Sequence, residues 1–173
     1  MLTIALPSSG PLYQSTIDFF NNAGINIERS SLRSYTGVTN FDREIKIIFQ
    51  RQSDISNSIN NKIADFGVVG LDRYLENKEL SKSKIVIEKM GYGKCDLVVA
   101  VPQKWGNINN MKDLANYSSE KKLKIATKYP LQTKKYFSEN NFKSYEIITT
   151  NGSVEVSPEM GIADLIVDIS STG

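Results

Sequence analysis

The sequence predicts an α/β protein with largely parallel sheets. Short apolar runs that are typical of strands alternate along the whole chain with segments whose apolar residues have helical spacing. The same alternation begins again after Pro102, so the elements fall into two groups. The segment Gly91-Tyr92-Gly93 between the groups is a plausible hinge, because paired glycines absorb backbone rotation with little steric penalty. No sequence repeat or low-complexity tract is apparent.

The first group begins with a strand at Leu2–Leu6, which ends at Pro7. A loop precedes Pro11, a residue suited to a first helical turn, and an apolar stripe of helical spacing then continues to Gly24. The later elements expected in this group are a strand at Glu44–Gln50, a helix capped by Ser53 and running through Asn60, a buried strand at Ile63–Val69, a helix around Leu71–Asn77, and strands near Ile85–Met90 and Asp96–Val101.

The second group follows the same plan. The elements expected there are a short helix near Asn110–Ala115, a strand at Leu123–Ala126, a helix at Pro130–Asn140, a strand at Tyr145–Thr149, a helix from Ser153 and a strand at Leu165–Ile169. Open α/β sheets bind ligands outside the carboxyl ends of their strands. The loops at residues 7–10, 70–72, 127–130 and 168–173 occupy that kind of position.

Composition limits the classes of function. The 173 residues can form one large domain or two small ones, and 40% hydrophobic with 23% charged residues is typical of a soluble globular protein. No apolar run reaches ~18 residues and the N-terminus does not resemble a signal peptide, so we expect no membrane segment and a cytoplasmic location. A net charge of +2 with scattered basic residues argues against nucleic-acid binding.

The chain contains no histidine and a single cysteine, Cys95. One cysteine excludes an internal disulfide and a cysteine-based zinc site, and its place before an apolar run favours a buried structural thiol over a nucleophile. The lack of histidine removes Ser–His and Cys–His nucleophile pairs and imidazole metal sites. Attention therefore moves to chemistry that uses phosphates, Mg²⁺, Arg, Lys and carboxylates.

The stretch from Glu155 to Gly173 carries the clearest functional signal. An apolar strand bears Asp168 near its carboxyl end and continues into Ser170, Ser171, Thr172 and Gly173. Small residues let backbone N–H groups converge on phosphate oxygens, and a single acid can accept hydrogen bonds from sugar hydroxyls or hold Mg²⁺. The stretch predicts an anion cradle, and its simpler alternative is a strand end with a polar turn.

Several segments together resemble one protein family. Besides residues 155–173, the similar segments are Arg51–Ile55, Ala64–Asp72, Gly91–Cys95, Ile125–Pro130 and Asn151–Glu155, in the family's order. At these residues the chain resembles the catalytic subunit of ATP phosphoribosyltransferase, the first enzyme of histidine biosynthesis. Each motif is short, but spaced segments in one order over nearly the full length are specific.

The resemblance implies a two-lobed fold like that of periplasmic solute-binding proteins, with mixed, mostly parallel sheets and ligands in a cleft between the lobes. Lobe I would comprise residues 1–92 and form the nucleotide side. Lobe II would comprise residues 93–173 and carry the phosphoribosyl pyrophosphate loop.

The resemblance also implies a reaction, in which N1 of the ATP adenine attacks C1 of phosphoribosyl pyrophosphate, inverts that carbon and releases pyrophosphate. The adenine nitrogen needs no deprotonation, so catalysis should depend on positioning and on stabilising leaving-group charge. The cofactor Mg²⁺ would be held mainly through substrate phosphates, without dedicated protein ligands.

The loop that would bind the donor, phosphoribosyl pyrophosphate, is the best matched part. Ser170, Ser171, Thr172 and Gly173 match the family loop that holds the 5-phosphate, and Asp168 matches the acid that reaches the ribose hydroxyls, with a catalytic role.

Two other acids of this region have alternatives. Glu155 would reach ribose hydroxyls of phosphoribosyl pyrophosphate, but a first-turn acid that stabilises a helix from Ser153 explains it equally well. Asp164 is expected in a turn or cap, because residues 161–164 resemble a helix-to-strand connection.

The ATP side depends on residues with stronger competing explanations. Arg51 is similar to a family arginine that contacts nucleotide and phosphates, and its fork can bind phosphate oxygens at two points in a catalytic role. Its alternative is an ordinary surface arginine. Asp54 is expected to support the following helix start. Asp72 matches a nucleotide-site acid, with helix N-capping as its competitor.

Three residues are expected where a strand gives way to a helix. Thr127 and Tyr129 would contact ATP, Lys128 adds positive charge, and the helix N-terminus favours anions. Tyr129 in simple core packing is nearly as good an explanation. Arg33 is a weaker candidate for a pyrophosphate contact within the ATP site, because residues 26–42 align poorly.

The chain departs from the family in two places. The family's first loop usually reads Pro-Lys-Gly-Arg, whereas this chain has Pro7-Ser8-Ser9-Gly10-Pro11. Each lost charged hydrogen bond to phosphate would cost roughly 1.5–3 kcal/mol, which serine hydroxyls and free amides can replace in part. The sequence also stops at Gly173, where the family continues with another threonine and a helix. We therefore expect any C-terminal helix that returns to lobe I to be absent.

The resemblance finally implies an assembly. A chain without the family's C-terminal regulatory domain corresponds to the short form, which forms dimers and a hetero-oligomer with a subunit resembling histidyl-tRNA synthetase. The substrates would be ATP and phosphoribosyl pyrophosphate. The alternative function is a non-catalytic ligand-binding or sensor paralogue of the same two-lobed build.

Overall fold

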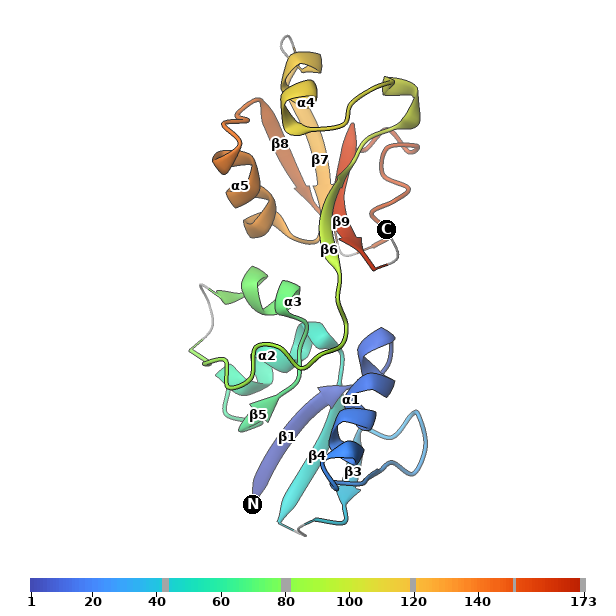
Figure 1. The fold of residues 1–173 in the computed structure, drawn as a ribbon, viewed down its shortest axis with the longest axis vertical. Helices are drawn as coiled ribbons and strands as arrows, with labels where there is room; N and C mark the ends of the chain where they lie inside the picture. Colours follow the sequence, from blue (N-terminus) through green and yellow to red (C-terminus); the bar gives the residue numbers. More distant parts are fainter. Residues whose placement is uncertain (42–43, 79–81, 119–120, 151, 172–173) are drawn as a thin grey trace. The chain divides into compact units, whose positions relative to one another are not determined.

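The computed structural model describes residues 1–41, 44–78, 82–118, 121–150 and 152–171. The chain divides into two compact units, Met1–Lys94 and Cys95–Gly173, each with its own sheet and its own core (Figure 1). The predicted α/β class with two lobes is confirmed. Both sheets are mixed, and each has a central strand with a parallel neighbour on either side.

Unit 1 contains a five-stranded sheet in the order β2-β3-β4-β1-β5. Its elements are β1 (Leu2–Pro7), α1 (Pro11–Asn22), β2 (Ile27–Glu28), β3 (Thr36–Thr39), β4 (Ile45–Gln50), α2 (Gln52–Asn60), β5 (Phe66–Gly67) and α3 (Leu71–Glu76). The central strand β1 pairs in parallel with β4 and β5, while β3 is antiparallel to both β2 and β4.

The two faces of the unit 1 sheet are covered by different helices, because side chains alternate between faces along a strand. Leu6, Ile47 and Phe49 pack with side chains of α1 on one face. Ala5 packs with Ile55 of α2 on the other. All five are almost fully buried. Helices α1 and α2 both follow strands of the parallel set, so their N-termini come at the carboxyl edge of the sheet.

Unit 2 contains a four-stranded sheet in the order β6-β9-β7-β8. Its elements are β6 (Asp96–Ala100), the 3₁₀ turn η2 (Gln103–Trp105), α4 (Met111–Tyr117), β7 (Leu123–Thr127), α5 (Pro130–Glu139), β8 (Tyr145–Thr149) and β9 (Leu165–Ser170). The central strand β7 is parallel to β8 and β9, and β6 runs antiparallel to β9 at the sheet edge.

The larger core of unit 2 joins α4 and α5 to one face of this sheet through Leu114, Phe137, Ile125 and Val167. On the opposite face, Ala126 and Val154 belong to a smaller cluster with Ala163.

A short sequence occurs once in each unit and has the same structure both times. Residues 58–65, before β5, and residues 157–164, before β9, share a serine, four variable positions and Ile-Ala-Asp. The carbonyl of Ser58 accepts from the N–H groups of Ile63 and Ala64, at 2.8 and 3.2 Å. The carbonyl of Ser157 accepts in the same way from the two equivalent residues, at 3.0 and 3.3 Å.

The acid that ends each copy pairs with the central strand. Asp65 accepts from the Thr3 N–H through its carboxylate at 2.8 Å, and Asp164 accepts from the Lys124 N–H at 2.8 Å. The backbone N–H of each acid donates in return to the carbonyl of the same partner. The expectation of no repeat was therefore wrong, because so few shared residues are not conspicuous until the strands align them.

Four predicted elements need correction. Ser53 does not cap α2, whose N-cap is Arg51; its hydroxyl donates to Asp54 instead, at 3.1 Å. The expected strand at Ile63–Val69 is only Phe66–Gly67 and is exposed. Residues 85–90 form no strand, and their apolar side chains lie largely exposed. The expected helix from Ser153 is absent: residues 155–161 form turns, because a residue before proline disfavours helical backbone and Pro158 interrupts the segment.

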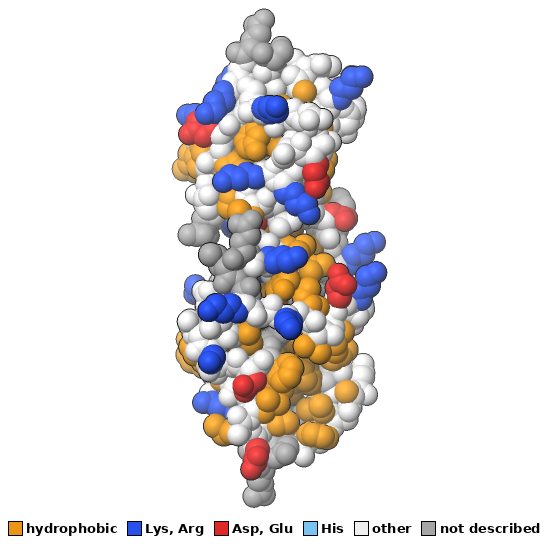
Figure 2. All heavy atoms as spheres, turned by 90° about the vertical axis from the view of Figure 1, so that its left-hand side faces the viewer, with side chains coloured by type: hydrophobic (Ala, Val, Ile, Leu, Met, Phe, Trp, Pro, Cys, Tyr) orange, Lys and Arg blue, Asp and Glu red, His pale blue; other side chains and the backbone are white. Residues whose placement is uncertain are grey.

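Charge on the surface, exposure of the cysteine and helix length were also predicted from the sequence. Figure 2 shows basic side chains spread over the visible face with acidic ones among them. Cys95, expected to be buried, is half-buried. Among the described residues, no helix has both the length and the apolar character that crossing a bilayer demands.

Candidate functional site

The loops of unit 1 that follow its parallel strands lie at one edge of the sheet. In the parallel register Pro7 is opposite Gln50, and the N–H of Ser8 donates to the Gln50 carbonyl at 2.7 Å. Strand β5, the other parallel neighbour of β1, pairs with the middle of β1 and leads into the loop before α3. Parallel strands bring their carboxyl ends to the same edge, which is where open α/β sheets bind ligands.

Arg51 lies at this edge as the N-cap residue of α2. Its backbone is extended, with φ −66° and ψ 146°, and its side chain is exposed. Within the described parts of the chain, its guanidinium has no hydrogen bond or ion pair. Asp54 follows in the first turn of α2, where its N–H donates to the Arg51 carbonyl at 2.9 Å. The structure therefore leaves the Arg51 side chain available to an anionic ligand.

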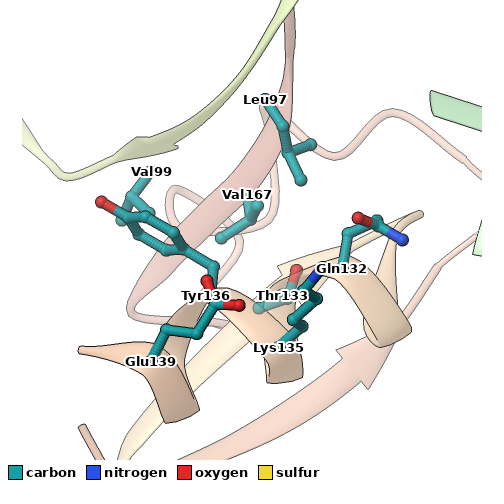
Figure 3. A pocket seen from close by; sticks show the side chains of 8 residues that line it. All are labelled: Leu97, Val99, Gln132, Thr133, Lys135, Tyr136, Glu139 and Val167. Atoms are coloured by element: carbon teal, nitrogen blue, oxygen red, sulfur yellow. The ribbon is translucent and has the colours of Figure 1, made fainter. Parts of the chain in front are cut away.

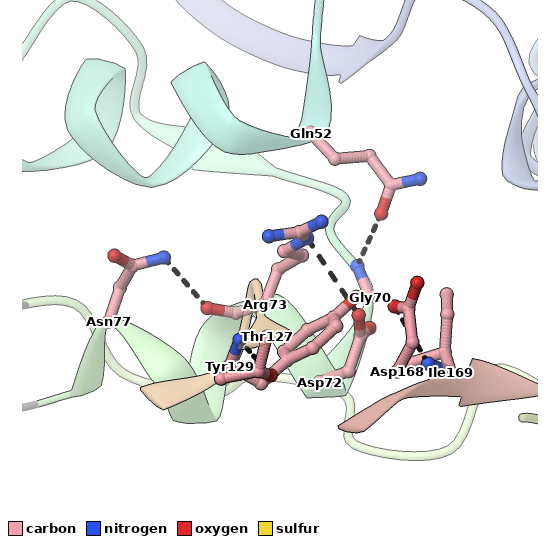
Figure 4. A network of polar contacts seen from close by, with 9 residues as sticks. All are labelled: Gln52, Gly70, Asp72, Arg73, Asn77, Thr127, Tyr129, Asp168 and Ile169. Atoms are coloured by element: carbon pink, nitrogen blue, oxygen red, sulfur yellow. Dashed lines mark hydrogen bonds and ion pairs between the residues drawn. The ribbon is translucent and has the colours of Figure 1, made fainter. Parts of the chain in front are cut away.

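The loop before α3 is tied to the start of α2. The N–H of Gly70 donates to Oε1 of Gln52 at 3.4 Å, as drawn in Figure 4. The Asp72 carboxylate folds back against Gly70. A Cβ on residue 70 would overlap this carboxylate, so any other residue there would displace the Asp72 side chain. The N-cap of α3 is Gly70, and Asp72 instead lies in the first turn, with Oδ2 3.9 Å from Nε of Arg73.

Two arginines, Arg29 and Arg33, lie in the segment between β2 and β3. Arg33, a predicted site residue, is exposed in a turn closed by the Ser34 N–H and the Ser31 carbonyl at 3.0 Å. Arg29, which the sequence did not single out, is half-buried and hydrogen-bonded to two loop carbonyls. Gln52 was also missed. Neither residue has a sequence signal, because their contacts join positions far apart in the chain.

The carboxyl edge of the unit 2 sheet is formed by the ends of β7, β8 and β9. Thr127 is opposite Thr149 on β8 and Val167 on β9, so Asp168 lies one residue beyond the partner of Thr127. Ser170 ends β9 opposite Asp96. The predicted residues Thr127, Asp168 and Ser170 therefore gather at one edge of the same sheet.

The turn from β7 into α5 is closed by Thr127. Its Oγ1 accepts from the Tyr129 N–H at 2.9 Å and lies 3.5 Å from the Thr133 hydroxyl (Figure 4 draws the first bond). Thr127 is completely buried and Tyr129 is 1% exposed. Lys128 between them is half-buried, and Pro130 begins the helix. In this structure the Thr127 hydroxyl supports the turn and does not face solvent.

Asp168 lies on β9 on the same face as Ile166, away from the larger core. Its Oδ1 accepts from the N–H of Ile169 at 2.9 Å, which leaves further acceptor capacity on the carboxylate. Ser170 is half-buried and Ser171 is exposed. Thr172 and Gly173 lie outside the described residues.

Two acids of the preceding segment differ in role. Glu155 is exposed within the turns that replace the expected helix, so its alternative as a first-turn helix acid does not hold. Asp164 pairs with the Lys121 ammonium and the Lys124 N–H. Burial alone would raise the pKa of Asp164, but these hydrogen bonds outweigh it and lower the pKa. Asp164 is therefore an ionised carboxylate with a structural role just before β9.

The hollow shown in Figure 3 does not coincide with these residues. It has a volume of about 220 Å³ and lies between α5 and strands β6 and β9 of unit 2. None of its lining side chains is a predicted site residue. In the described ranges, no three acidic, cysteine or histidine side chains gather closely enough to hold a metal.

Comparison with known proteins points to one family. A family model described as ATP phosphoribosyltransferase matches residues 51–173. The ATP phosphoribosyltransferase of Rhizobium etli (strain ATCC 51251) is 36% identical over 181 residues, which cover 99% of this chain and 78% of that protein. That of Agrobacterium fabrum is 35% identical over 184 residues, covering 100% of this chain and 79% of that protein.

A solved structure agrees. The ATP phosphoribosyl transferase (HisG:HisZ) complex from Thermotoga maritima contains a chain that superposes with a TM-score of 0.73 and 29% sequence identity. The match covers 100% of this chain and 76% of that one.

Proposed function

Because the chain belongs to the ATP phosphoribosyltransferase family, we propose that it transfers the phosphoribosyl group from phosphoribosyl pyrophosphate to N1 of ATP. The observation that supports this function most directly is the edge of the unit 2 sheet. There Asp168 and Ser170 follow one another to the carboxyl end of β9, beside the turn that Thr127 closes. We place the reaction at the first step of histidine biosynthesis, in the cytoplasm.

The reaction needs positioning and charge stabilisation more than a base. The N1 lone pair of adenine forms a bond to C1 of the ribose, while the bond from C1 to the pyrophosphate oxygen breaks and that oxygen keeps the electron pair. N1 carries no proton, so none has to be removed for attack. A chain without histidine is suited to this chemistry, because cationic and N–H donors near the leaving group supply the stabilisation.

The proposed site for phosphoribosyl pyrophosphate is in unit 2. Asp168 accepts hydrogen bonds from the ribose hydroxyls, using the carboxylate capacity that the Ile169 N–H leaves free. Ser170, Ser171, Thr172 and Gly173 bind the 5-phosphate through hydroxyl and backbone donors. In this proposal the exposed Glu155 is a second acceptor for the ribose hydroxyls.

Arg51 of unit 1 is the main residue proposed to bind ATP. Arg51 is exposed and unpaired among the described residues, so it can bind phosphate oxygens through two parallel donors and neutralise leaving-group charge. Asp72 and Arg33 contribute from unit 1. In unit 2, Tyr129 is 1% exposed, which favours the alternative of core packing over a stack on adenine. Thr127 would act indirectly, by holding the turn that leads into α5.

The cofactor in this proposal is Mg²⁺. Mg²⁺ is commonly held by substrate phosphates together with one or two carboxylates and water, and it would screen the negative charge of the two polyphosphates. Asp168 is the carboxylate nearest in sequence to the proposed phosphate loop. It could be a single protein ligand to an Mg²⁺ ion that is held mainly by the substrate phosphates.

We also propose an assembly. The solved relative is a complex of two kinds of chain, HisG and HisZ. By analogy, this chain would form a dimer that joins a regulatory subunit resembling histidyl-tRNA synthetase. Size-exclusion chromatography with light scattering, on the chain alone and mixed with such a subunit, measures this directly.

A pyrophosphate-release assay tests the function. The purified chain, with and without the regulatory partner, is given Mg²⁺, ATP and phosphoribosyl pyrophosphate, and each substrate is omitted in turn. We expect release that requires both substrates, together with a new product that absorbs as N1-substituted adenine. Binding of both ligands without turnover under all conditions would instead assign the chain to the non-catalytic sensor class, which Ser8 and Ser9 in the first loop would then explain.

A further inference from the structure

The Arg29 side chain joins two loops of unit 1. Its Nε donates to the Ser34 carbonyl at 2.8 Å, and its Nη1 donates to the Ser8 carbonyl at 2.9 Å. Ser8 follows β1 at the carboxyl edge of the sheet, and Ser34 closes the turn that carries Arg33. One guanidinium therefore links the first loop to the loop between β2 and β3.

Two aromatic rings hold this guanidinium in place. Its Cζ lies 4.1 Å from the centroid of Phe49 and 5.5 Å from the centroid of Tyr13, distances typical of cation–π contacts. Phe49 is completely buried. Its ring can lie against β3 only because residue 37 is glycine, since a Cβ there would be 2.9 Å from the ring and 2.8 Å from the Glu28 carbonyl.

We propose that Arg29 is a positioning residue for the nucleotide polyphosphate. It acts by fixing the loop at residues 8–10 and the turn at residues 31–34 relative to each other. This inference rests on the proposed function for the identity of the ligand. Arg29 itself does not react; it sets the place of the first loop and of Arg33, which the proposed function assigns to the ATP site.

The physical basis is the planar fork of arginine. Two carbonyls from different loops accept from two nitrogens of one rigid plane, and the central carbon of that plane lies over the Phe49 ring. Lysine has the same charge but a single tetrahedral ammonium, so it cannot bridge both carbonyls and stack on the ring together. Loops that are already ordered bind with less loss of conformational entropy on association. Loss of the bridge should therefore weaken nucleotide binding without affecting the unit 2 loop.

The test compares Arg29→Lys and Arg29→Gln with the unaltered chain. Hydrogen–deuterium exchange without substrates should become faster in peptides covering residues 7–12 and 30–36, and stay unchanged in α2 and in unit 2. Calorimetric titration with Mg²⁺–ATP should show about tenfold weaker binding, equal to about 1.4 kcal/mol. The KM for phosphoribosyl pyrophosphate should not change. Lys46→Gln is the control, because Lys46 is an exposed cation of β4 opposite Thr3, away from the carboxyl edge.

Each outcome decides the proposal. Local faster exchange with weaker ATP binding in both Arg29 variants supports it. Normal exchange and ATP affinity in Arg29→Lys would show that charge alone matters, and faster exchange throughout unit 1 would show that Arg29 only stabilises the fold; either result overturns it. If the unaltered chain binds no ATP, the proposed function fails, whereas the exchange measurement still decides whether Arg29 orders the two loops.

Discussion

The phenolic oxygen of Tyr92 lies 3.0 Å from Oγ1 of Thr16, a residue 76 positions earlier in the chain. Thr16 is fully buried in α1, and its own hydroxyl donates to the Leu12 carbonyl at 2.6 Å. A hydrogen bond therefore joins the two hydroxyls, and the Tyr92 hydroxyl also lies 3.7 Å from Sδ of Met90. Gly91 and Gly93 on either side have positive φ, 84° and 68°. The segment predicted as a hinge is thus fastened to α1 at its central residue, with the flexible positions next to it.

The variant Tyr92→Phe should lower the free energy of unfolding by about 1 kcal/mol, because it removes the hydrogen bond between Tyr92 and the buried Thr16 hydroxyl. Urea denaturation followed by far-UV circular dichroism measures the change. The matched control is Tyr35→Phe, since the Tyr35 side chain is 79% exposed and its loss of a hydroxyl should have no effect. Equal stability of both variants would show that the Tyr92 hydrogen bond contributes nothing.

Tyr92 should also make unfolding sensitive to alkali. Burial raises the pKa of Tyr92 above its ordinary 10.0, and the hydrogen bond with Thr16 offsets only part of this. Above pH ~10 the unfolded state loses the phenolic proton while the folded state keeps it, so stability is complete below that pH and falls as pH rises through the folded pKa. Unfolding curves from about pH 8 to 11 should show a smaller loss for Tyr92→Phe than for the unaltered chain. Parallel losses would contradict the assignment.

Asp164 should give the opposite dependence. Its pKa is lowered, so its contribution is present above the unfolded value of ~3.9 and disappears as pH falls through the folded pKa. Asp164→Asn keeps an acceptor for the Lys124 N–H but loses the ion pair with the largely exposed Lys121, so we expect a loss of about 0.5–1 kcal/mol at neutral pH. The difference should shrink on acidification. Glu159→Gln, an exposed acid of the same segment, should not change stability.

Arg51→Ala separates catalysis from folding. The side chain is exposed and has no hydrogen bond or ion pair among the described residues, so stability should change by less than about 0.5 kcal/mol. Turnover should fall by about a hundredfold or more, as it does when a donor to developing negative charge is removed. Arg51→Lys should restore only part of the activity, because lysine cannot donate in a fork.

The comparison for Arg51 is Lys46→Ala, an exposed cation on β4 with no proposed ligand role. Steady-state pyrophosphate release and thermal unfolding are measured on the same samples. A proportional loss of activity and of stability in Arg51→Ala would make the residue structural and remove it from the site.

Local patterns predicted the elements that have strong periodicity. The strand at Tyr145–Thr149 has the expected bounds, and the helix from Pro130 ends within one residue of the expected position. The apolar run at residues 85–90 was misleading, because whether a run becomes a strand depends on a partner strand and not on its own composition. Strands β2 and β3 were missed because they are short and polar.

The sequence by itself determined the α/β class, the family resemblance, and the position of Arg51 just after one strand and of Asp168 near the end of another, because periodicity and motif spacing are properties of neighbouring residues. Only the tertiary structure revealed the repeated Ser-x₄-Ile-Ala-Asp turn, the burial of the Thr127 hydroxyl and the bridge from Arg29 to the Ser8 and Ser34 carbonyls. These features join atoms from strands and loops distant in the chain. Their energies depend on how the sheets pair and pack, which no local pattern specifies.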